Sequence, residues 1–125
     1  VLERILAGCE FLQHDAELGA IQKQNFRKAV QAGVKMAFGT DAGVCPHGTN
    51  ARQFHYMVEN GMTPMQAIQA ATVNAAELIG HPELFGSITA GKSADIIAVP
   101  GNPLADVRQL EHVSFVMKEG RIYRE

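Results

Sequence analysis

One short apolar run constrains the fold of this chain more than any other feature. Residues 34–40 are largely apolar, follow a predicted helix end at Gly33, and give way to small and polar residues at Asp41. A helix, a tight link and a run of this length are typical of a strand that enters a parallel sheet. A fully buried strand needs parallel neighbours and helices on both faces. Because the sequence offers one such run, we expect it to belong to a larger sheet.

Helical spacing of apolar residues precedes and follows this run. The first helix is predicted to stop at Gly33, because glycine accepts the left-handed conformation that ends helices. After a loop, a second helix is predicted with Thr49 or Asn50 as its cap. A third is predicted to begin at Thr63, with a capping box and a proline in its first turn, and to run to Gly80. The first half of the chain is therefore expected to be mainly helical.

The pattern changes to β from about residue 85. Residues 94–99 are predicted to form a strand, and residues 113–117 and 121–123 flank a short polar turn, which is typical of a hairpin. Two or three short strands are marginally stable alone. Both this hairpin and the single buried run lead us to expect that the chain is the carboxyl-terminal part of a larger protein.

Composition excludes several classes of function. The chain has 125 residues, 46% of them apolar and 19% charged, with a net charge of −2. Without a block of like charges, neither nucleic-acid binding nor attraction to an anionic membrane is indicated. No apolar run approaches the ~20 residues of a membrane span. Cys9 and Cys45 fit neither a disulfide framework nor a zinc-ribbon spacing.

Asp41 is the main candidate for chemistry, since it follows the predicted strand directly. In barrels of alternating strands and helices, catalytic residues cluster at the carboxyl ends of the strands. A carboxylate there, with small neighbours that leave room for a ligand, can serve as a metal ligand or a general base. The alternative is an aspartate that caps the next helix or stabilises the turn.

Several motifs occur in a fixed order between residues 34 and 123: Gly39-Thr40-Asp41, Gly61-Met62-Thr63-Pro64-Met65-Gln66-Ala67, Ala71-Thr72-Val73-Asn74-Ala75-Ala76, Gly86-Ser87-Ile88 through Gly91-Lys92-Ser93-Ala94-Asp95, and Val116-Met117-Lys118-Glu119-Gly120-Arg121. In this order and spacing the chain resembles the amidohydrolase superfamily, metal-dependent hydrolases built on a distorted (β/α)8 barrel. The loop Pro46-His47-Gly48-Thr49-Asn50 is most similar to the branch of Xaa-Pro dipeptidases and imidazolonepropionase-type enzymes.

The resemblance implies an α/β fold class. Residues 1–85 would be the terminal segment of the (β/α)8 barrel, and residues 86–125 the carboxyl-terminal part of a small β-sandwich. Asp41 would end barrel strand 8, ligate a divalent metal, most commonly one or two zinc ions, and take a proton from the attacking water. The family's other ligands, a His-x-His pair, a carboxylated Lys or a Glu, and two further histidines, have no counterpart in this sequence. We therefore expect the isolated chain to lack a complete metal site and activity.

Other polar residues have weaker functional interpretations. His47 could contact substrate, either a carboxylate or the leaving group, or be an exposed loop histidine. Asn50 is expected to cap a helix rather than touch substrate, and His55 to lie in packing or at the surface. Asp95 is expected to hold a turn or to pair with a base such as Lys92.

The resemblance implies a hydrolase of an amide-type C–N bond in a small molecule, a dipeptide or an N-acyl amino acid. One alternative is a non-catalytic scaffold or interaction protein of the same fold, against which Asp41 argues. Another is a hydrolase of a cyclic amide, an ester or a deaminated ring. Association into a homo-oligomer is compatible with each of these.

Overall fold

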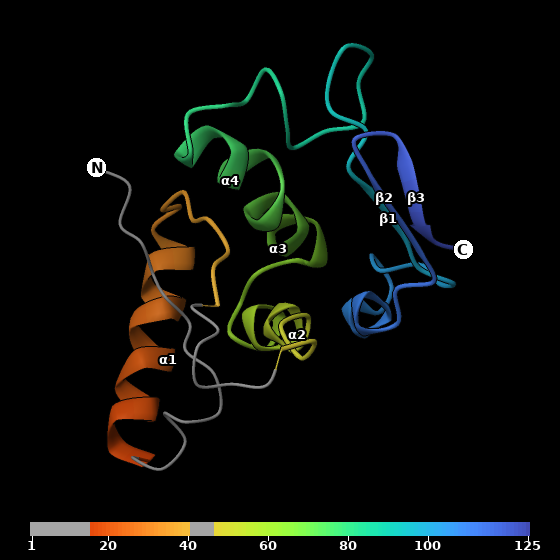
Figure 1. The fold of residues 1–125 in the computed structure, drawn as a ribbon. Helices are drawn as coiled ribbons and strands as arrows, with labels where there is room; N and C mark the ends of the chain where they lie inside the picture. Colours follow the sequence, from red (N-terminus) through yellow and green to blue (C-terminus); the bar gives the residue numbers. More distant parts are fainter. Residues whose placement is uncertain (1–15, 41–46) are drawn as a thin grey trace.

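The structure, a computed structural model, describes residues 16–40 and 47–125. In order along the chain, these residues form the helices α1 (Ala16–Gln31), α2 (Arg52–Glu59), α3 (Pro64–Ala71) and α4 (Val73–Leu78), then strand β1 (Ile96–Ala98), the 3-10 helix η2 (Val107–Glu111), and strands β2 (Phe115–Lys118) and β3 (Arg121–Arg124). The α-helices lie on one side of the molecule and the small sheet on the other (Figure 1). The α/β character predicted from the sequence is confirmed.

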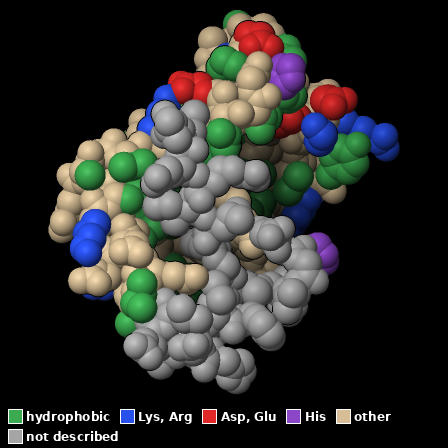
Figure 2. All heavy atoms as spheres, turned by 90° about the vertical axis from the view of Figure 1, so that its left-hand side faces the viewer, with side chains coloured by type: hydrophobic (Ala, Val, Ile, Leu, Met, Phe, Trp, Pro, Cys, Tyr) green, Lys and Arg blue, Asp and Glu red, His purple; other side chains and the backbone are tan. Residues whose placement is uncertain are grey.

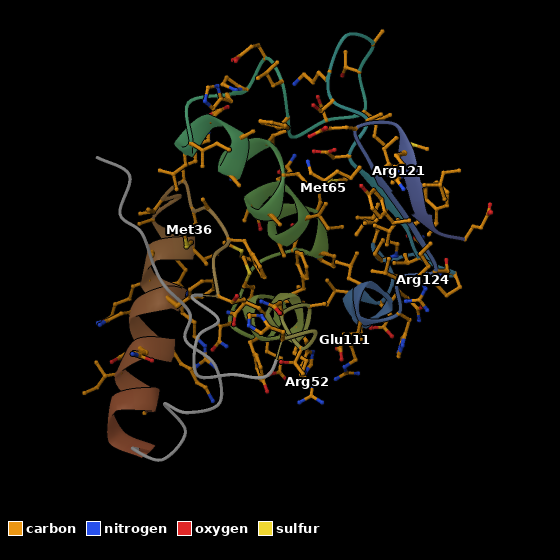
Figure 3. All side chains as sticks on the ribbon, in the orientation of Figure 1. Met36, Arg52, Met65, Glu111, Arg121 and Arg124 are labelled. Carbon is orange, nitrogen blue, oxygen red and sulfur yellow. The ribbon has the colours of Figure 1, made fainter. Side chains whose placement is uncertain are left out.

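The hydrophobic core lies among α1, α2, α3 and the segment that follows α1. Its buried members come from these four parts and from the connection between α2 and α3: Phe26, Met36, Met57, Met62, Ala67 and Ala70. Ala67 and Ala70 of α3 are fully buried, and their small side chains allow the neighbouring segments to approach the helix closely. Met36 places the segment between α1 and α2 inside this core (Figure 3).

The start of α3 is set by the predicted capping box. The Thr63 hydroxyl accepts a hydrogen bond from the Gln66 backbone N–H (3.2 Å), and the Gln66 side chain accepts one from the Thr63 N–H (2.8 Å). The single helix predicted from there to Gly80 is wrong, because the chain breaks at Thr72 into α3 and α4. The Thr72 hydroxyl donates to the Ile68 carbonyl (2.8 Å), and such side-chain bonds compete with regular helix geometry.

The sheet is antiparallel, in the order β1-β2-β3. The predicted hairpin is confirmed, with Met117 opposite Ile122 and a two-residue connection between β2 and β3. That connection has positive φ at both Glu119 (51°) and Gly120 (78°), as a type I′ turn requires. Strand β1 completes the sheet, with Ile97 opposite Val116. Every one of these strands therefore finds its neighbour within a short stretch of the chain.

Residues 34–40 form no strand, contrary to the prediction. The segment is instead attached to helices. The Phe38 N–H donates to the Ala70 carbonyl of α3 (2.9 Å), and the Asn74 side chain of α4 donates to the Met36 carbonyl (2.9 Å). A strand exists through its ladder of bonds to a neighbouring strand, and the described strands lie in the sheet on the far side of the helices (Figure 1). The apolar run is present, but the described residues provide no strand to pair with it.

Helix α2 and η2 join the helical side to the sheet side. Arg52 Nε lies 4.0 Å from Glu111 Oε2, and both side chains lie at this junction in Figure 3. His55 Nε2 lies 3.0 Å from Glu59 Oε1 and 3.2 Å from an Arg108 guanidinium nitrogen. His55 therefore sits in a polar junction between two elements, in agreement with its predicted packing or surface role.

The surface of the described residues carries mixed charge. On the face in Figure 2, basic and acidic side chains do not gather into one large patch of a single sign. Within the described ranges, no helix has the length and apolar character needed to cross a membrane.

Candidate active-site loop

The candidate site is the loop between residues 34–40 and α2. Asp41, the residue predicted to carry the chemistry, belongs to residues 41–46 and lies outside the described residues. His47, the other predicted site residue, is exposed and forms a turn with Gly48, whose φ is 93°. The structure therefore places His47 at the surface, and the role of Asp41 stays a prediction.

A side-chain hydrogen bond joins the two ends of this loop. Asn50 Nδ2 donates to Thr40 Oγ1 over 2.7 Å, and both residues are half-buried. The prediction that Asn50 caps the next helix is wrong: α2 has Ala51 at its N-cap position and no side-chain capping bond. The side-chain amide of Asn50 instead donates its hydrogen bond to Thr40, the residue immediately before Asp41. Sequence reasoning missed this contact, because a ten-residue separation across a loop has no periodic signal.

An aromatic pair lies beside this bond. The rings of Phe38 and Phe54 are stacked, with centroids 4.8 Å apart and an angle of 15° between their planes. Both side chains pack against the core. Stacked aromatic pairs of this kind contribute about 0.5–1.5 kcal/mol beyond their buried area. The end of the segment is therefore attached to α2 by the aromatic contact, and to the residue before the N-cap of α2 by the hydrogen bond.

A complete metal centre is not formed by the part of the chain that the structure describes. No group of three or more His, Cys, Asp or Glu side chains there could hold an ion. Zinc sites in proteins use at least three protein ligands, and whether Asp41 is one of them stays a prediction.

Asp95 has the structural role that was predicted, with a different partner. Its carboxylate accepts a hydrogen bond from the Glu119 N–H (2.8 Å). It also forms an ion pair with Lys118, whose Nζ lies 3.2 Å from Asp95 Oδ2. The Glu119 N–H, and then Lys118, hold the pKa of the Asp95 carboxyl below its usual value. The predicted pairing with Lys92 is wrong, because Lys92 donates to two backbone carbonyls of the preceding turn. Asp95 thus stabilises the hairpin and is separate from the candidate site.

With this geometry in place, comparisons with known proteins identify the family. A sequence model described as the amidohydrolase family matches residues 8–123. The chain belongs to the amidohydrolase family. Ochratoxinase from Aspergillus niger is 38% identical over 104 residues, which cover 79% of this chain and 21% of that protein. Imidazolonepropionase from Geobacillus sp. strain WCH70 is 35% identical over 107 residues, 78% of this chain and 24% of that protein.

A solved structure extends the similarity to the fold. The crystal structure of a Xaa-Pro dipeptidase with bound methionine in its active site superposes with a TM-score of 0.84 and 53% identity, over 88% of this chain and 27% of that one. The resemblance to amidohydrolases, and to the branch with Xaa-Pro dipeptidases and imidazolonepropionases, is thereby confirmed. This amidohydrolase chain spans between 21% and 27% of the length of these three relatives.

Proposed function

We propose that this chain is part of a metal-dependent hydrolase that cleaves an amide-type C–N bond, in a dipeptide or an N-acyl amino acid. The observation that carries the proposal is the similarity to the Xaa-Pro dipeptidase, at 53% identity over 88% of the chain. The protein that contains these residues and completes the active site is called the parent enzyme below. Its substrate is a small molecule, and the chain supplies the end of its active site.

Within the parent enzyme, we assign residues 1–85 to the last part of a (β/α)8 barrel and residues 86–125 to part of a β-sandwich. Two observations support this assignment. Residues 34–40 have a strand-like sequence without a strand neighbour among the described residues, so parallel strands of a barrel would supply the missing ladder. The sheet leaves the apolar side chain of Ile97 55% exposed, and a second sheet packed on that face would cover it.

Asp41 is the catalytic residue of this proposal. It follows Thr40 at the end of the segment that would be the last barrel strand, the edge where catalytic residues of such barrels gather. A bound divalent ion, zinc by this proposal, supplies Lewis acidity and makes water nucleophilic at neutral pH. We assign to the Asp41 carboxylate one ligand position and the acceptance of a proton. We assign the other ligands to the rest of the parent enzyme, since the described residues contain no group of three or more possible ligand side chains.

His47 is proposed to contact the substrate. Its side chain is exposed in the same loop, five residues before α2, where an imidazole can reach a substrate carboxylate or leaving group without being part of the core. A residue that only holds substrate acts mainly on KM. His47→Ala is therefore expected to raise KM of the parent enzyme while kcat stays near its original value.

The experiment that tests this function is Asp41→Asn in the parent enzyme. Asparagine keeps the size of the side chain but removes its charge and its capacity to accept a proton. We expect kcat on the best dipeptide or N-acyl amino acid to fall by ~10²–10⁴, the usual contribution of a positioned general base, with an unchanged thermal transition.

Two results would contradict the proposal. Near-normal kcat together with a lower thermal midpoint would make Asp41 a structural cap. Failure of the zinc-loaded parent enzyme to hydrolyse any dipeptide, N-acyl amino acid, cyclic amide or ester would instead favour the scaffold interpretation.

A further inference from the structure

His55 of α2 has two hydrogen-bond partners on one ring nitrogen. Its Nε2 lies 3.0 Å from Glu59 Oε1, one turn later on the same helix, and 3.2 Å from a guanidinium nitrogen of Arg108 on η2. The two partners require opposite roles of this nitrogen, because a guanidinium only donates hydrogen bonds and an ionised carboxylate only accepts them. An imidazole nitrogen is either a bare acceptor or a protonated donor. Nε2 therefore satisfies only one of its two partners at a time.

We propose that His55 is a pH-sensitive switch between these two partners. In the neutral ring, with its hydrogen on Nδ1, the bare Nε2 accepts the hydrogen bond from Arg108 and links α2 to η2. Protonation places a hydrogen on Nε2, which then donates to Glu59 within α2, and the charged ring repels the guanidinium. Histidine is the side chain that ordinarily changes its charge between about pH 5 and 8. Acidification over this range thus replaces a contact between two elements by a contact within one helix.

The other titratable and charged groups around the ring are a second ion pair, a capping carboxylate and a tyrosine. Arg52 Nε of α2 lies 4.0 Å from Glu111 Oε2 of η2, and this link does not involve His55. Asp106 caps the start of η2, and the ring of Tyr56 lies 5.8 Å from that of His55. Helix α3, which also packs against α2, has no titratable side chain. Carboxylates ordinarily titrate near pH 4, and tyrosine and arginine at about pH 10 and above, so a histidine is the group suited to act between about pH 5 and 8.

The switch acts on the polar edge of the junction and leaves its apolar part in place. Val107 of η2 is 4% exposed, so η2 stays packed after the hydrogen bond from Arg108 is lost. One hydrogen bond of ordinary net strength changes a local opening equilibrium by about three- to tenfold. We therefore expect a local loosening of η2 and no separation of the helices from the sheet. None of these residues belongs to the candidate active-site loop, so the inference does not depend on the proposed function.

Hydrogen exchange of η2 in the parent enzyme measures this loosening. Protection factors, which correct for the intrinsic effect of pH on exchange, are determined for residues 107–112 at about pH 8 and about pH 5.5, on either side of the histidine range. In the wild type we expect protection to fall about three- to tenfold on acidification. In His55→Gln the side-chain oxygen can still accept from Arg108 but cannot titrate, so protection should stay within about twofold. In Arg108→Met, which removes the donor, protection should already be low at about pH 8 and change little with pH.

Two other histidines of the chain provide matched controls. His112 directly follows η2, and His81 forms a pair with a carboxylate, its Nδ1 lying 3.3 Å from Glu83 Oε1. His112→Gln and His81→Gln should each keep the fall in protection that the wild type shows. A fall that persists in His55→Gln, or one that disappears in His112→Gln, would overturn the inference.

A second measurement follows the hydrogen on the ring itself. Histidine in the parent enzyme is labelled with a heavy nitrogen isotope, and the His55 resonances are assigned by their loss in His55→Gln. Nitrogen chemical shifts distinguish a bare ring nitrogen from a protonated one. At about pH 8 we expect Nε2 to be bare and Nδ1 to carry the hydrogen, and on acidification Nε2 should gain a hydrogen together with the fall in η2 protection. A neutral ring that carries its hydrogen on Nε2 would contradict the switch, because Arg108 would then find no acceptor on His55.

Discussion

Residues 34–40 and residues 115–124 have similar strand-like sequences, yet only the second region forms strands. Strand β2 reaches its partner β3 through a two-residue turn, and β1 adds a third strand. Residues 34–40 lie among helices, with no strand beside them in the described residues. The comparison shows that an apolar pattern makes a segment suitable for a strand. The segment becomes a strand only where a second strand lies beside it and forms the hydrogen-bond ladder.

The two regions are also held by different forces. The hairpin has backbone ladders, a turn with two positive φ angles and the Asp95 carboxylate bound to its turn. The segment of residues 34–40 is held by helices through Met36 in the core, the stack of Phe38 and the hydrogen bond of Thr40. Substitutions in the two regions should therefore differ in kind and in size.

The largest stability effect is expected from Met36→Ala. Met36 is 4% exposed in the core, and truncation of such a methionine costs about 2–5 kcal/mol through lost burial and the cavity left behind. Met65→Ala is the matched control, since Met65 of α3 is 46% exposed and its loss should stay below about 1 kcal/mol. Both methionines are labelled in Figure 3. Denaturant unfolding of the two variants measures the difference, and equal losses would mean that residues 34–40 do not anchor the core.

A smaller loss of stability is expected from a substitution in the other region, at the turn of the hairpin. Gly120 has φ of 78° and open space around the position of a Cβ atom, so Gly120→Ala adds strain without a clash and should cost about 1–2 kcal/mol. Gly39 has equally open described surroundings and no positive φ. Gly39→Ala should therefore be neutral or stabilise by up to about 1 kcal/mol. Thermal unfolding of both variants measures this difference. A larger loss of stability in Gly39→Ala than in Gly120→Ala would contradict the expectation.

The smallest effect concerns the charge of Asp95 in the sheet region. Because the Glu119 N–H and Lys118 lower the folded-state pKa of this carboxyl, its ionised form stabilises the fold above the unfolded-state pKa of about 4. That contribution is lost as pH falls through the lowered folded-state pKa. Asp95→Asn should hence be less stable than wild type near pH 7, and the difference should shrink below about pH 4. A difference independent of pH would show that the charge of Asp95 does not contribute.

The sequence predicted most of the local structure, because caps, turns and helix periods are short-range signals. Thr63 as a cap, the turn at Gly120 and the helix stop at Gly33 depend on residues a few positions apart. The break at Thr72 was missed, because a threonine hydroxyl that bonds a carbonyl four residues earlier competes with the helix only in some contexts. Local spacing carries no information about whether a strand finds a partner.

The candidate site was predicted unevenly for the same reason. Asp41 and His47 were predicted from the order of the motifs and from their position after an apolar run. His47 is exposed, which is compatible with a contact to substrate. The bond between Asn50 and Thr40 crosses a loop and had no sequence signal. Asn50 was assigned by local preference to a helix cap, and a tertiary contact outweighed that preference.

Hydrogen exchange of backbone amides tests the central claim most directly, namely that residues 34–40 lack a strand partner among the residues that the structure describes. It is measured for residues 34–40 and 115–124, in the isolated chain and in the parent enzyme. In the isolated chain, the Phe38 amide, bonded to Ala70, should exchange more slowly than its neighbours in the segment. In the parent enzyme, protection of the whole segment should rise far more than that of residues 115–124, because parallel strands complete its ladder. Equal protection of residues 34–40 in both proteins would contradict the account.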